Sequence, residues 1–505
     1  MSNSTLQVYG GDEISAVVID PGSYSTNIGY SGTDCPHSIL PSRYGSFKKT
    51  NKDSGDEDTK SDESATKRAH IFSEQSLGLP RKDYEIKTIV ENGAVTDWDA
   101  AQEQWEWALK NELFLESTKG IPALLTEPVW NTKKNRKKSL ETLLESMNFE
   151  ACYLAPTSTC VSFATGRANC LVVDIGHDTC SVSPVVDGMT LSKSTRRSFF
   201  AGKYINHLIE NFLKPREIIP LFAVEQRRPE FKRKKFEYQV DLSLYTYANA
   251  RGFFEECKET LLQITTTSSL EKIKPELESM SKRSIEAPWT ENIVMDNVTR
   301  YGFGEQLFEV NKSDIPETWN IDKDGIVETF HNDYVPLKRN KFSAANKPDT
   351  AKENTPAPSV EPTGVASETA NDVNENGKRN LEESNNGPEL EPKDNNEIMG
   401  LADLVHSSIM ASDVDLRASL AHNVQLTGGT SLIPGLSDRL MLELNARLPA
   451  LKFRILTTGH KKEREYQSWL GGSVLTSLGT FHQLWVGRQE YEEVGADRLL
   501  NDRFR

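Results

Sequence analysis

The sequence predicts an α/β protein in which short buried strands alternate with amphipathic helices and two polar insertions leave the fold. Three observations support this prediction. Apolar positions recur with strand spacing in some segments and with helical spacing in others. A strand pattern ending in Asp-x-Gly occurs twice. Two stretches hold too few large apolar side chains to form a core, although patterned sequence resumes after each. Mixed strands and helices are typical of α/β folds.

Strands are expected first over residues 14–20 and 26–31, because the turn pair Pro21-Gly22 separates two short apolar runs. Helices follow wherever apolar residues recur every three or four positions, and each such stripe is most simply core packing. The expected helices cover residues 98–113, with Asp97 or Asp99 as the N-cap, and residues 140–147, 156–166, 253–264, 436–444 and 470–485.

Two stretches are expected to be disordered. Residues 48–69 are almost all Lys, Asp, Glu, Ser and Thr, and residues 343–396 contain no aromatic side chain. Neither stretch can bury enough apolar surface to offset the entropy lost on ordering. We therefore interpret both as insertions into a fold that continues on either side.

Composition limits the possible functions. The 505 residues carry 59 Lys and Arg against 74 Asp and Glu, a formal net charge of −15, which argues against a broad nucleic-acid-binding surface. No apolar run approaches the roughly 20 residues that span a bilayer, and the first residues do not resemble a signal peptide. The six cysteines form no Cys-x-x-Cys pair, so reduced thiols are expected rather than a metal site.

The repeated pattern suggests a clamp for phosphate. Residues 16–23 end in Asp20-Pro21-Gly22-Ser23, and residues 171–177 end in Asp174-Ile175-Gly176-His177. Glycine lets the turn backbone approach a ligand, and successive N–H groups in a tight turn bind anions. Asp20 and Asp174 can hold Mg²⁺ through its waters. A single strand of this kind is usually only a hairpin, but two copies suggest a duplicated fold that holds a nucleotide between its halves.

A third segment fits the same interpretation. Residues 424–430 form an apolar strand pattern that runs into Gly428-Gly429-Thr430, and Pro434 then opens a helix. Paired glycines before a helix let the backbone lie against a base or ribose. Lys258 and Glu259, on a predicted helix, are candidates for the ribose side, although such a pair is more often a solvated charge pair.

These motifs resemble actin and its relatives. The resemblance is strongest near the C-terminus and covers nearly everything except the two insertions and a loosely similar segment over residues 214–246. Its motifs are Asn423-Val424, Thr427-Gly428-Gly429-Thr430, Pro434-Gly435-Leu436-Ser437-Asp438-Arg439, Trp469-Leu470-Gly471-Gly472-Ser473, Thr480-Phe481, Gln489-Glu490-Tyr491, Leu125-Thr126-Glu127-Pro128 and Ser408-Ile409-Met410. Within the family the chain is most similar to nuclear actin-related proteins of fungal chromatin-remodelling and histone acetyltransferase complexes.

The resemblance implies the superfold shared by actin, Hsp70 and hexokinase, with two lobes and four subdomains around an ATP cleft. Subdomain 1 would comprise residues 1–41, 81–157 and 466–505, and subdomain 2 residues 42–80 with the insertion 48–69. Subdomain 3 would comprise residues 158–200 and 397–465, and subdomain 4 residues 201–312. Residues 313–342 would connect to the disordered acidic insertion 343–396.

By the same resemblance, a set of residues is expected to bind ATP with Mg²⁺. These residues are Asp20, Gly22, Ser23, Tyr24, Asn27, Asp174, Gly176, His177, Gly202, Lys258, Glu259, Gly428, Gly429 and Thr430, with Asp20 and Asp174 holding the metal through water.

Several positions depart from actin. Asn27 stands where actin has a phosphate-binding lysine, and Tyr24 replaces a loop glycine. Thr157 stands where actin has the glutamine that positions the attacking water, while His177, Ser181 and Glu465 replace an aspartate, a histidine and a base-side lysine. Hydrolysis needs a positioned water and charge stabilisation on the transferred phosphoryl group. We therefore expect ATP binding with little hydrolysis and no catalytic residue. The alternative is a cleft that Tyr24 holds shut without ligand.

The resemblance also predicts partners. In actin a groove at one end receives amphipathic helices, and the matching positions here are Phe163, Gly166, Val474, Leu475, Leu478 and Leu484. The expected partners are an actin monomer and the helicase/SANT-associated scaffold helix of remodeller and acetyltransferase subunits, with histones or nucleosomal DNA as further candidates. The predicted function is a nuclear, non-catalytic structural subunit serving transcription regulation, histone-variant exchange and DNA repair.

Two alternatives belong to other classes. A filament-forming, actin-like ATPase is disfavoured by the altered cleft and the polar 48–69 stretch. A phosphotransferase or a chaperone would need a general base or a substrate-binding domain, and neither is evident. Basic residues cluster over residues 227–235 and again over residues 133–138. The first cluster is a candidate for a nuclear localisation signal or a DNA contact, although a solvated surface is the simpler interpretation.

Overall fold

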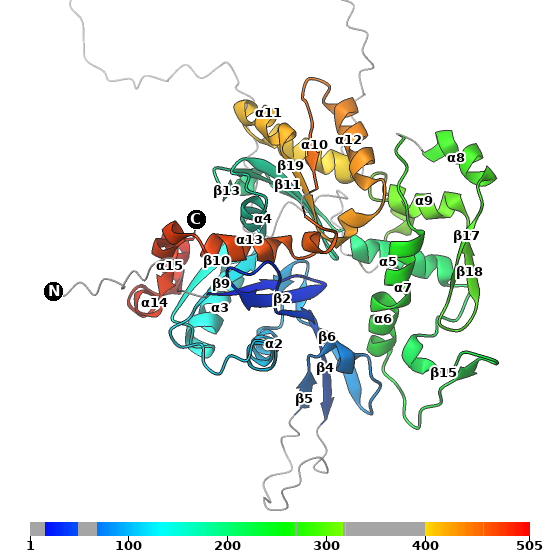
Figure 1. Ribbon diagram of the computed structural model, residues 1–505, viewed down its shortest axis with the longest axis horizontal. Coiled ribbons are helices and arrows are strands. Elements are labelled where there is room, and N and C mark those ends of the chain that lie inside the picture. Colours follow the sequence, from blue (N-terminus) through cyan, green and yellow to red (C-terminus); the bar gives the residue numbers. More distant parts are fainter. Residues whose placement is uncertain are drawn as a thin grey trace, which may run out of the picture. The chain divides into compact units, whose positions relative to one another are not determined.

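The computed structural model describes residues 16–48, 68–267, 270–316, 319, 399–457 and 459–504, all within one compact unit. Both sequence-predicted classes of element are present, and they alternate along the chain (Figure 1). Two six-stranded sheets organise the described residues. Residues 343–396 and most of 48–69 lie outside the described part of the chain, as does the start of the first predicted strand.

The first sheet contains the strand that carries Asp20. Its order is β21-β10-β9-β1-β2-β3, and β1 pairs antiparallel with β2 and parallel with β9. All five residues of β1 are buried, which explains its continuous apolar sequence. The strands of this sheet are β1 (Val17–Pro21), β2 (Ser25–Tyr30), β3 (Ser38–Pro41), β9 (Pro122–Glu127), β10 (Ala151–Pro156) and β21 (Val486–Gly487).

The second sheet repeats this arrangement around Asp174. Its order is β13-β12-β11-β19-β20, with β14 paired to β12. The central strand β11 pairs antiparallel with β12 and parallel with β19, as β1 does with β2 and β9. The duplication predicted from the sequence is therefore present in the strand pairing. The strands are β11 (Cys170–Ile175), β12 (Cys180–Val186), β13 (Met189–Thr190), β14 (Arg196–Ser198), β19 (Val424–Thr427) and β20 (Ile455–Leu456).

Short sheets make up the remaining strands. These strands are β4 (Arg43–Lys48), β5 (Arg68–Ile71), β6 (Tyr84–Thr88), β7 (Val90–Glu91), β8 (Ala94–Val95), β15 (Val224–Gln226), β16 (Lys232–Arg233), β17 (Arg283–Glu286) and β18 (Asn292–Met295). Lys48 pairs with Arg68, and Phe47 pairs with Ala69. The prediction that the polar insertion begins at residue 48 and ends at residue 69 is therefore wrong at both edges, because ladder hydrogen bonds keep these polar residues in strands.

Most predicted helices are present, and Asp97 caps α2 by accepting from the N–H of Ala100. The helices are α1 (Glu74–Leu77), α2 (Trp98–Asn111), α3 (Lys133–Leu140), α4 (Thr157–Ala164), α5 (Gly202–Leu213), α6 (Leu242–Arg251), α7 (Phe253–Leu261), α8 (Leu270–Ser279), α9 (Asn297–Glu305), α10 (Leu401–Ala411), α11 (Val414–His422), α12 (Leu436–Arg447), α13 (Gln467–Thr476), α14 (Arg488–Val494) and α15 (Ala496–Asp502). A π-helical turn, Glu141–Ser146, continues α3 over the predicted 140–147 stripe. Among the described helices, none is long and apolar enough to span a membrane.

The helix predicted over 470–485 is too long. The α-helix α13 ends at Thr476, and a 3₁₀ segment, Gly479–Leu484, follows it. The α13 helix instead crosses α4 closely. A Cβ added at Gly471 would lie only 1.7 Å from the carbonyl oxygen of Cys160 on α4. Glycine at this position therefore sets how closely the two helices pack.

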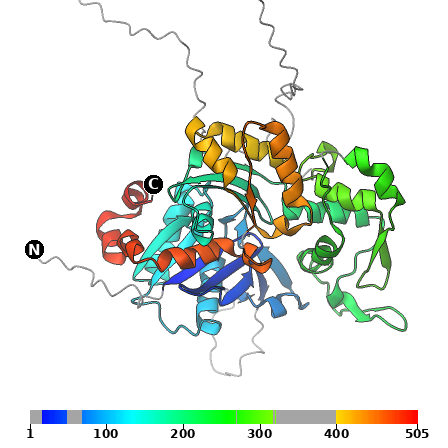
Figure 2. The same ribbon diagram turned by 45° about the horizontal axis from the view of Figure 1, so that its top comes forward.

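Each large sheet has its own apolar core. Buried residues of β11 and β19 pack with α5, α7, α10 and α12, and buried residues of β1 and β9 pack with α2 and α3. Figure 2 shows helices covering the strands of both sheets. All six cysteines are free thiols, and five of them are buried. The division into four subdomains stays a prediction.

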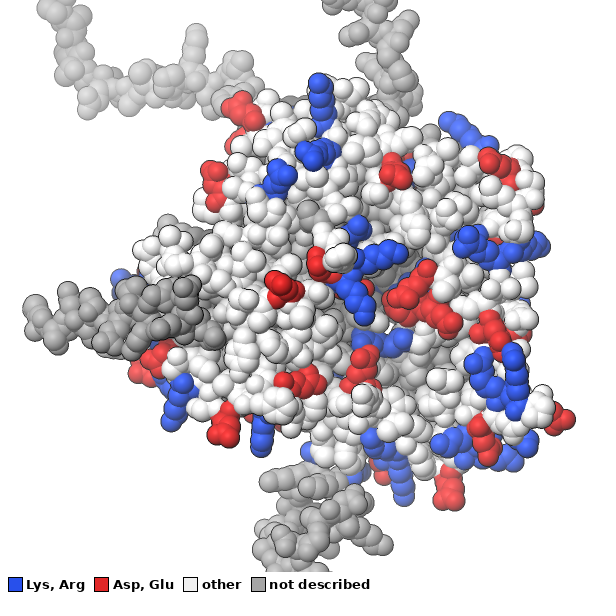
Figure 3. All heavy atoms as spheres, in the orientation of Figure 1, with Lys and Arg blue, Asp and Glu red and all other residues white. Residues whose placement is uncertain are grey.

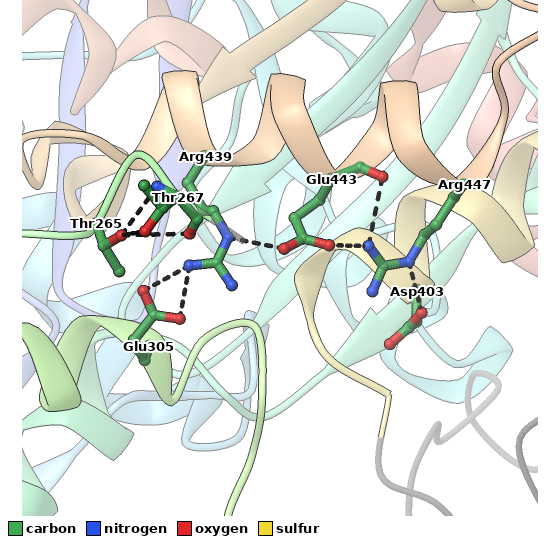
Figure 4. A network of polar contacts seen from close by, with 7 residues as sticks. All are labelled: Thr265, Thr267, Glu305, Asp403, Arg439, Glu443 and Arg447. Carbon is green, nitrogen blue, oxygen red and sulfur yellow. Dashed lines mark hydrogen bonds and ion pairs between the residues drawn. The ribbon is translucent and has the colours of Figure 1, made fainter. Parts of the chain in front are cut away.

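A buried ion-pair network fixes α12 to α9 and α10 (Figure 4). Arg439 of α12 is fully buried and donates to both carboxylate oxygens of Glu305 at 2.6 Å. Arg439 also contacts Glu443 at 2.8 Å, and Arg447 joins Glu443 to Asp403 of α10. The charges are compensated within the network, as buried charges must be.

Candidate functional site

Two matching hairpins form the centre of the candidate site. In the first hairpin, between β1 and β2, the N–H of Gly22 donates to the carbonyl of Ser25 at 3.0 Å. In the second, between β11 and β12, the N–H of Gly176 donates to the carbonyl of Thr179 at 3.0 Å. The predicted phosphate clamps thus share one turn geometry as well as one sequence pattern.

The two predicted metal-holding aspartates differ in their surroundings. Asp20 accepts hydrogen bonds from Asn27 at 3.2 Å, from Ser468 at 2.6 Å and from Thr126. Burial, together with the negative charge of Asp20, raises the pKa of Asp174 to about 7. A divalent cation near these carboxylates would lower the electrostatic cost of ionising Asp174 beside Asp20. This arrangement fits Mg²⁺ held through water.

No larger metal site is present in the part of the chain that the structure describes. No group of three His, Cys, Asp or Glu side chains there could hold an ion directly. The assignment of Asp20 and Asp174 as the residues that hold a metal through water stays a prediction. Such a pair suits a hydrated Mg²⁺ that takes its other ligands from phosphate and water.

The third glycine segment packs directly against the second hairpin. Gly428 has φ +87°, and a Cβ there would lie 2.3 Å from the carbonyl oxygen of Ile175. Thr430 donates to the carbonyl of Gly176 at 2.7 Å, and the N–H of Gly202 donates to the same oxygen at 3.1 Å. Gly428, Thr430, Gly176 and Gly202 are thus brought together, in agreement with the sequence prediction.

Tyr24 connects the first hairpin to the second. Its ring centroid lies 5.3 Å from that of His177. The guanidinium of Arg251, at the end of α6, lies 3.9 Å from the centroid of the Tyr24 ring. Arg251 also donates to the Tyr24 carbonyl at 3.0 Å and to Glu74 at 2.7 Å. Tyr24 therefore contacts two segments that are far from it in the sequence, beside the hairpins where the phosphates of a nucleotide are expected.

His177 is held in its neutral form. Burial lowers the pKa of His177 well below its ordinary value, and positive charge around it lowers the pKa further. The cations responsible are Lys258, Arg43, Lys203 and Arg251. This positive surrounding suits an anionic ligand such as a triphosphate. Three of these four residues, Arg43, Lys203 and Arg251, were not predicted from the sequence, because nothing in their local pattern distinguishes them from surface cations.

One turn joins both hairpins and was also missed. The N–H of Gly93 donates to Ser23 at 2.9 Å, and the N–H of the preceding Asn92 donates to Asp178 at 3.0 Å. Asn92 and Gly93 both have positive φ, at 51° and 78°. The Asn-Gly pair signals a turn in the sequence, but nothing local shows that the turn would contact residues 70 and 86 positions away.

The positions that differ from actin are engaged in internal contacts. The hydroxyl hydrogen of Thr157 is donated to the carbonyl of Glu127 at 2.9 Å, and this short side chain lacks the amide group of the glutamine that it replaces. Asn27 donates to Asp20 rather than carrying a positive charge to the ligand. Ser181 pairs with Asp174 across the second hairpin and is buried. All three residues are therefore engaged in contacts within the protein.

The predicted base side carries negative charge. Glu465 lies beside Gly429, and burial together with Glu259 and Glu255 raises its pKa. Lys258 forms an ion pair with Glu255 at 3.0 Å. Carboxylates here accept hydrogen bonds, so they suit ribose hydroxyls and an exocyclic amine. The face drawn in Figure 3 is hollowed near its centre, where basic and acidic side chains meet.

An apolar cluster joins β6 and α1 to α6, the helix that ends at Arg251. Ser243 of α6 accepts from the N–H of Ile86 at 2.9 Å, and Tyr238 donates to the carbonyl of Pro80 at 2.9 Å. The buried members of the cluster are Leu77, Tyr84, Ile86, Leu244 and Tyr247. With Arg251, this cluster links the part of the chain that follows the first hairpin to the part that follows the second.

The predicted partner groove is only partly exposed. Val474, Leu478 and Leu484 have exposed fractions of 39%, 40% and 45%. Phe163 is partly buried, and Gly166 ends the α4 segment with open space around it. Leu475 was assigned to the groove wrongly, because the helical period of α13 turns it into the core with Trp469 and Phe481. The exposed apolar surface is therefore smaller than predicted.

Comparison with known proteins agrees with this geometry. A protein-family model described as Actin matches residues 11–504. The chain therefore belongs to the actin family, and the predicted actin-like α/β fold is confirmed. Over 511 aligned residues it is 68% identical to the protein of Saccharomyces cerevisiae named Actin-related protein 4, with 100% of both chains covered. Proteins of the same name from Eremothecium gossypii and Schizosaccharomyces pombe are 60% and 32% identical, with 100% and 98% of each chain covered.

Proposed function

We propose that this actin-related protein is an ATP-binding, non-catalytic structural subunit of nuclear chromatin-remodelling and histone acetyltransferase complexes. In this role it pairs with an actin monomer on a scaffold helix and supports transcription regulation, histone-variant exchange and DNA repair. The full-length similarity to proteins named Actin-related protein 4 supports the proposal.

One observation carries the nucleotide part of the proposal. Both phosphate hairpins keep their glycine turns, while Thr157 and Asn27 are held in internal hydrogen bonds. Binding needs the turns and the surrounding cations, whereas hydrolysis also needs a positioned water and charge stabilisation in the transition state. A protein that has the turns and the cations, but lacks the groups that position the water and stabilise the transition state, binds ATP and retains it unhydrolysed.

The residues present fit ATP with Mg²⁺. The turns at Gly22 and Gly176 would face the phosphates, and Asp20 and Asp174 would hold the waters of the metal. Lys258, Glu259 and Gly428-Gly429-Thr430 would lie along the ribose and base. The bound Mg²⁺ would neutralise phosphate charge. Tyr24, whose ring is tilted against that of His177 and lies under Arg251, would cover the phosphates and exclude solvent.

Asp174→Asn should separate stability from metal binding. The pKa of Asp174 in the folded protein, about 7, exceeds the ordinary value of 3.8 for an aspartate, so ionised Asp174 destabilises the fold. That penalty is full above pH 7 and disappears as the pH falls through 7 towards 4. The variant without ligand should therefore melt at or above the wild-type temperature above pH 7. It should also lose most of the stabilisation by Mg·ATP, about 3 kcal/mol at about 100 times Kd.

Thermal melts with and without Mg·ATP, above and below pH 7, measure both effects. Wild-type protein should show a smaller Mg²⁺-dependent gain at the lower pH, because protonated Asp174 no longer attracts the cation. An unchanged Mg²⁺-dependent gain in the variant would remove Asp174 from the metal site.

Leu478→Asp tests the proposed partner surface. Leu478 is partly exposed on the apolar surface after α13, and such a surface is stabilised when a helix covers it. A charge there should cost about 2–4 kcal/mol of binding to the scaffold helix, on the scale of interface hot spots. Leu442→Asp on α12 is the matched control, since Leu442 is also exposed but lies outside the predicted groove.

Co-purification of both variants with the scaffold helix and actin measures this effect, and circular dichroism confirms folding. Equal retention of the two variants would exclude the groove as the docking surface. Sedimentation of the wild-type chain with Mg·ATP tests the alternative function, since a filament-forming ATPase would assemble into polymer.

A further inference from the structure

Two short hairpins line an open polar hollow that the proposed function does not use. The hollow has a volume of about 330 Å³ and lies between β15–β16 and β17–β18. Arg227, Arg228 and Phe231 line one side, and Glu286, Thr290 and Asn292 line the other. A volume of this size is at the lower end of the range of small-ligand pockets, so it accommodates a few side chains of a peptide.

The two arginines share a single carboxylate. Arg227 contacts Glu286 at 3.3 Å, and one nitrogen of Arg228 lies 3.1 Å from each of the two oxygens of Glu286. The side chain of Arg228 nevertheless has an exposed fraction of 77%. Arg227 also donates to the carbonyl of Ala287 at 3.3 Å. Each guanidinium carries five N–H donors, so the Glu286 carboxylate and this carbonyl occupy only some of the donors of the pair. The hollow therefore has surplus positive charge and donors arranged for a planar carboxylate.

The basic surface extends from the hollow along β16. Lys232, Lys234 and Lys235 are exposed, and within the described residues none of them has an ion-pair partner. Arg233 pairs with Glu217. In Figure 3, Lys and Arg side chains gather at the lower right, the region where Figure 1 places β15, with acidic side chains among them. The run from residue 227 to 235 holds six basic residues and one acidic residue in a chain of net charge −15.

We propose that this hollow and the lysines beside it bind an acidic peptide segment of a partner protein. An Asp or Glu side chain of the peptide enters the hollow and accepts from Arg228, beside the contact that Glu286 already makes. Thr290 and Asn292 offer polar groups to the peptide backbone, and Phe231 offers an apolar surface. Further carboxylates of the segment face the three lysines. A hollow of about 330 Å³ with Phe231 in its wall admits single side chains of a peptide, whereas it is too small to admit a stiff DNA duplex.

The test is fluorescence anisotropy of the full chain with a labelled peptide rich in Glu and Asp around a central Leu. A peptide with Gln and Asn at the acidic positions is the reference ligand. Arg227→Ala/Arg228→Ala should weaken binding about tenfold or more. Lys272→Ala/Lys282→Ala removes the same charge from exposed positions elsewhere and should change affinity less than about twofold. Glu286→Gln should tighten binding, since it removes the internal competitor for the arginines.

The outcomes decide between clear alternatives. Equal weakening by the two double variants, or equal affinity for the Gln/Asn peptide, would overturn a specific site. A random-sequence DNA duplex that binds more tightly than the peptide, and depends on the same arginines, would assign the surface to nucleic acid instead. If the arginine variant does not fold, Glu286→Gln still decides, because unchanged or weakened binding by that variant contradicts the proposal.

Discussion

Arg439→Ala should lower the free energy of unfolding by about 3–5 kcal/mol. Arg439 is fully buried and donates to both oxygens of Glu305 at 2.6 Å and to Glu443 at 2.8 Å (Figure 4). Removing the guanidinium leaves the buried carboxylate of Glu305 without its cation. It also breaks the contact between α12 and α9, so the loss is larger than that of an exposed ion pair.

The loss of unfolding free energy caused by Arg439→Ala should depend on pH. Burial raises the pKa of Glu305, while Arg439 acts to lower it. Without the guanidinium that pKa rises further, so Glu305 takes up a proton as the pH falls and the uncompensated charge disappears. The stability lost in the variant should therefore be largest at alkaline pH and become smaller towards acid pH.

Urea unfolding at several pH values measures both effects. Arg447→Ala is the control, because Arg447 belongs to the same network but its side chain is 19% exposed and its loss should cost less. A loss of unfolding free energy below about 1 kcal/mol for Arg439→Ala, or a loss equal to that of the control, would contradict the proposal that the buried pair of Arg439 and Glu305 stabilises the fold.

Leu244→Ala should accelerate release of bound nucleotide by about tenfold or more. Leu244 is fully buried in the apolar cluster that joins α6 to β6 and α1. Truncating a buried leucine costs about 2–5 kcal/mol, and here the lost contacts are those that hold two segments around the proposed cleft together. Loss of those contacts should favour an opened cleft, from which nucleotide escapes.

Leu444→Ala separates this effect from general destabilisation. Leu444 of α12 is equally buried but packs in the core of the second sheet. Both variants should lower the melting temperature, whereas only Leu244→Ala should speed the exchange of a fluorescent ATP analogue. If both variants release nucleotide at the same rate, the cluster does not control access to the cleft.

The sequence predicted the two hairpins because their signal is local. A buried strand, an aspartate and a glycine turn are consecutive, and β1 and β11 form where this pattern stands. The contacts between the hairpins could not be predicted. Arg251 reaches Tyr24, and Gly93 reaches Ser23, across 227 and 70 positions. No alternation or spacing in the sequence encodes such contacts, since they arise only when separate elements pack.

The predictions from the sequence that were wrong failed for local reasons. Helical spacing continues past Thr476, but the backbone changes to a 3₁₀ segment at Gly479, so a periodic stripe alone overextended α13. Leu475 lies next to exposed Val474 in the sequence, yet neighbouring helical positions point in different directions. The edges of the polar insertion were misplaced because Lys48 and Arg68 are strand residues whose polar side chains are compatible with the end of a hairpin.

The measurement that tests the central proposal most directly is single-turnover hydrolysis of ATP by the purified chain in the presence of Mg²⁺, with the bound nucleotide identified by chromatography. The glycine turns are retained, but Thr157 stands in place of a glutamine and Asn27 in place of a cation. We therefore expect near-stoichiometric bound ATP that stays unhydrolysed while an actin control converts its ATP. Conversion of bound ATP to ADP at the rate of the actin control would contradict the account, and would show that His177 or another group positions the attacking water.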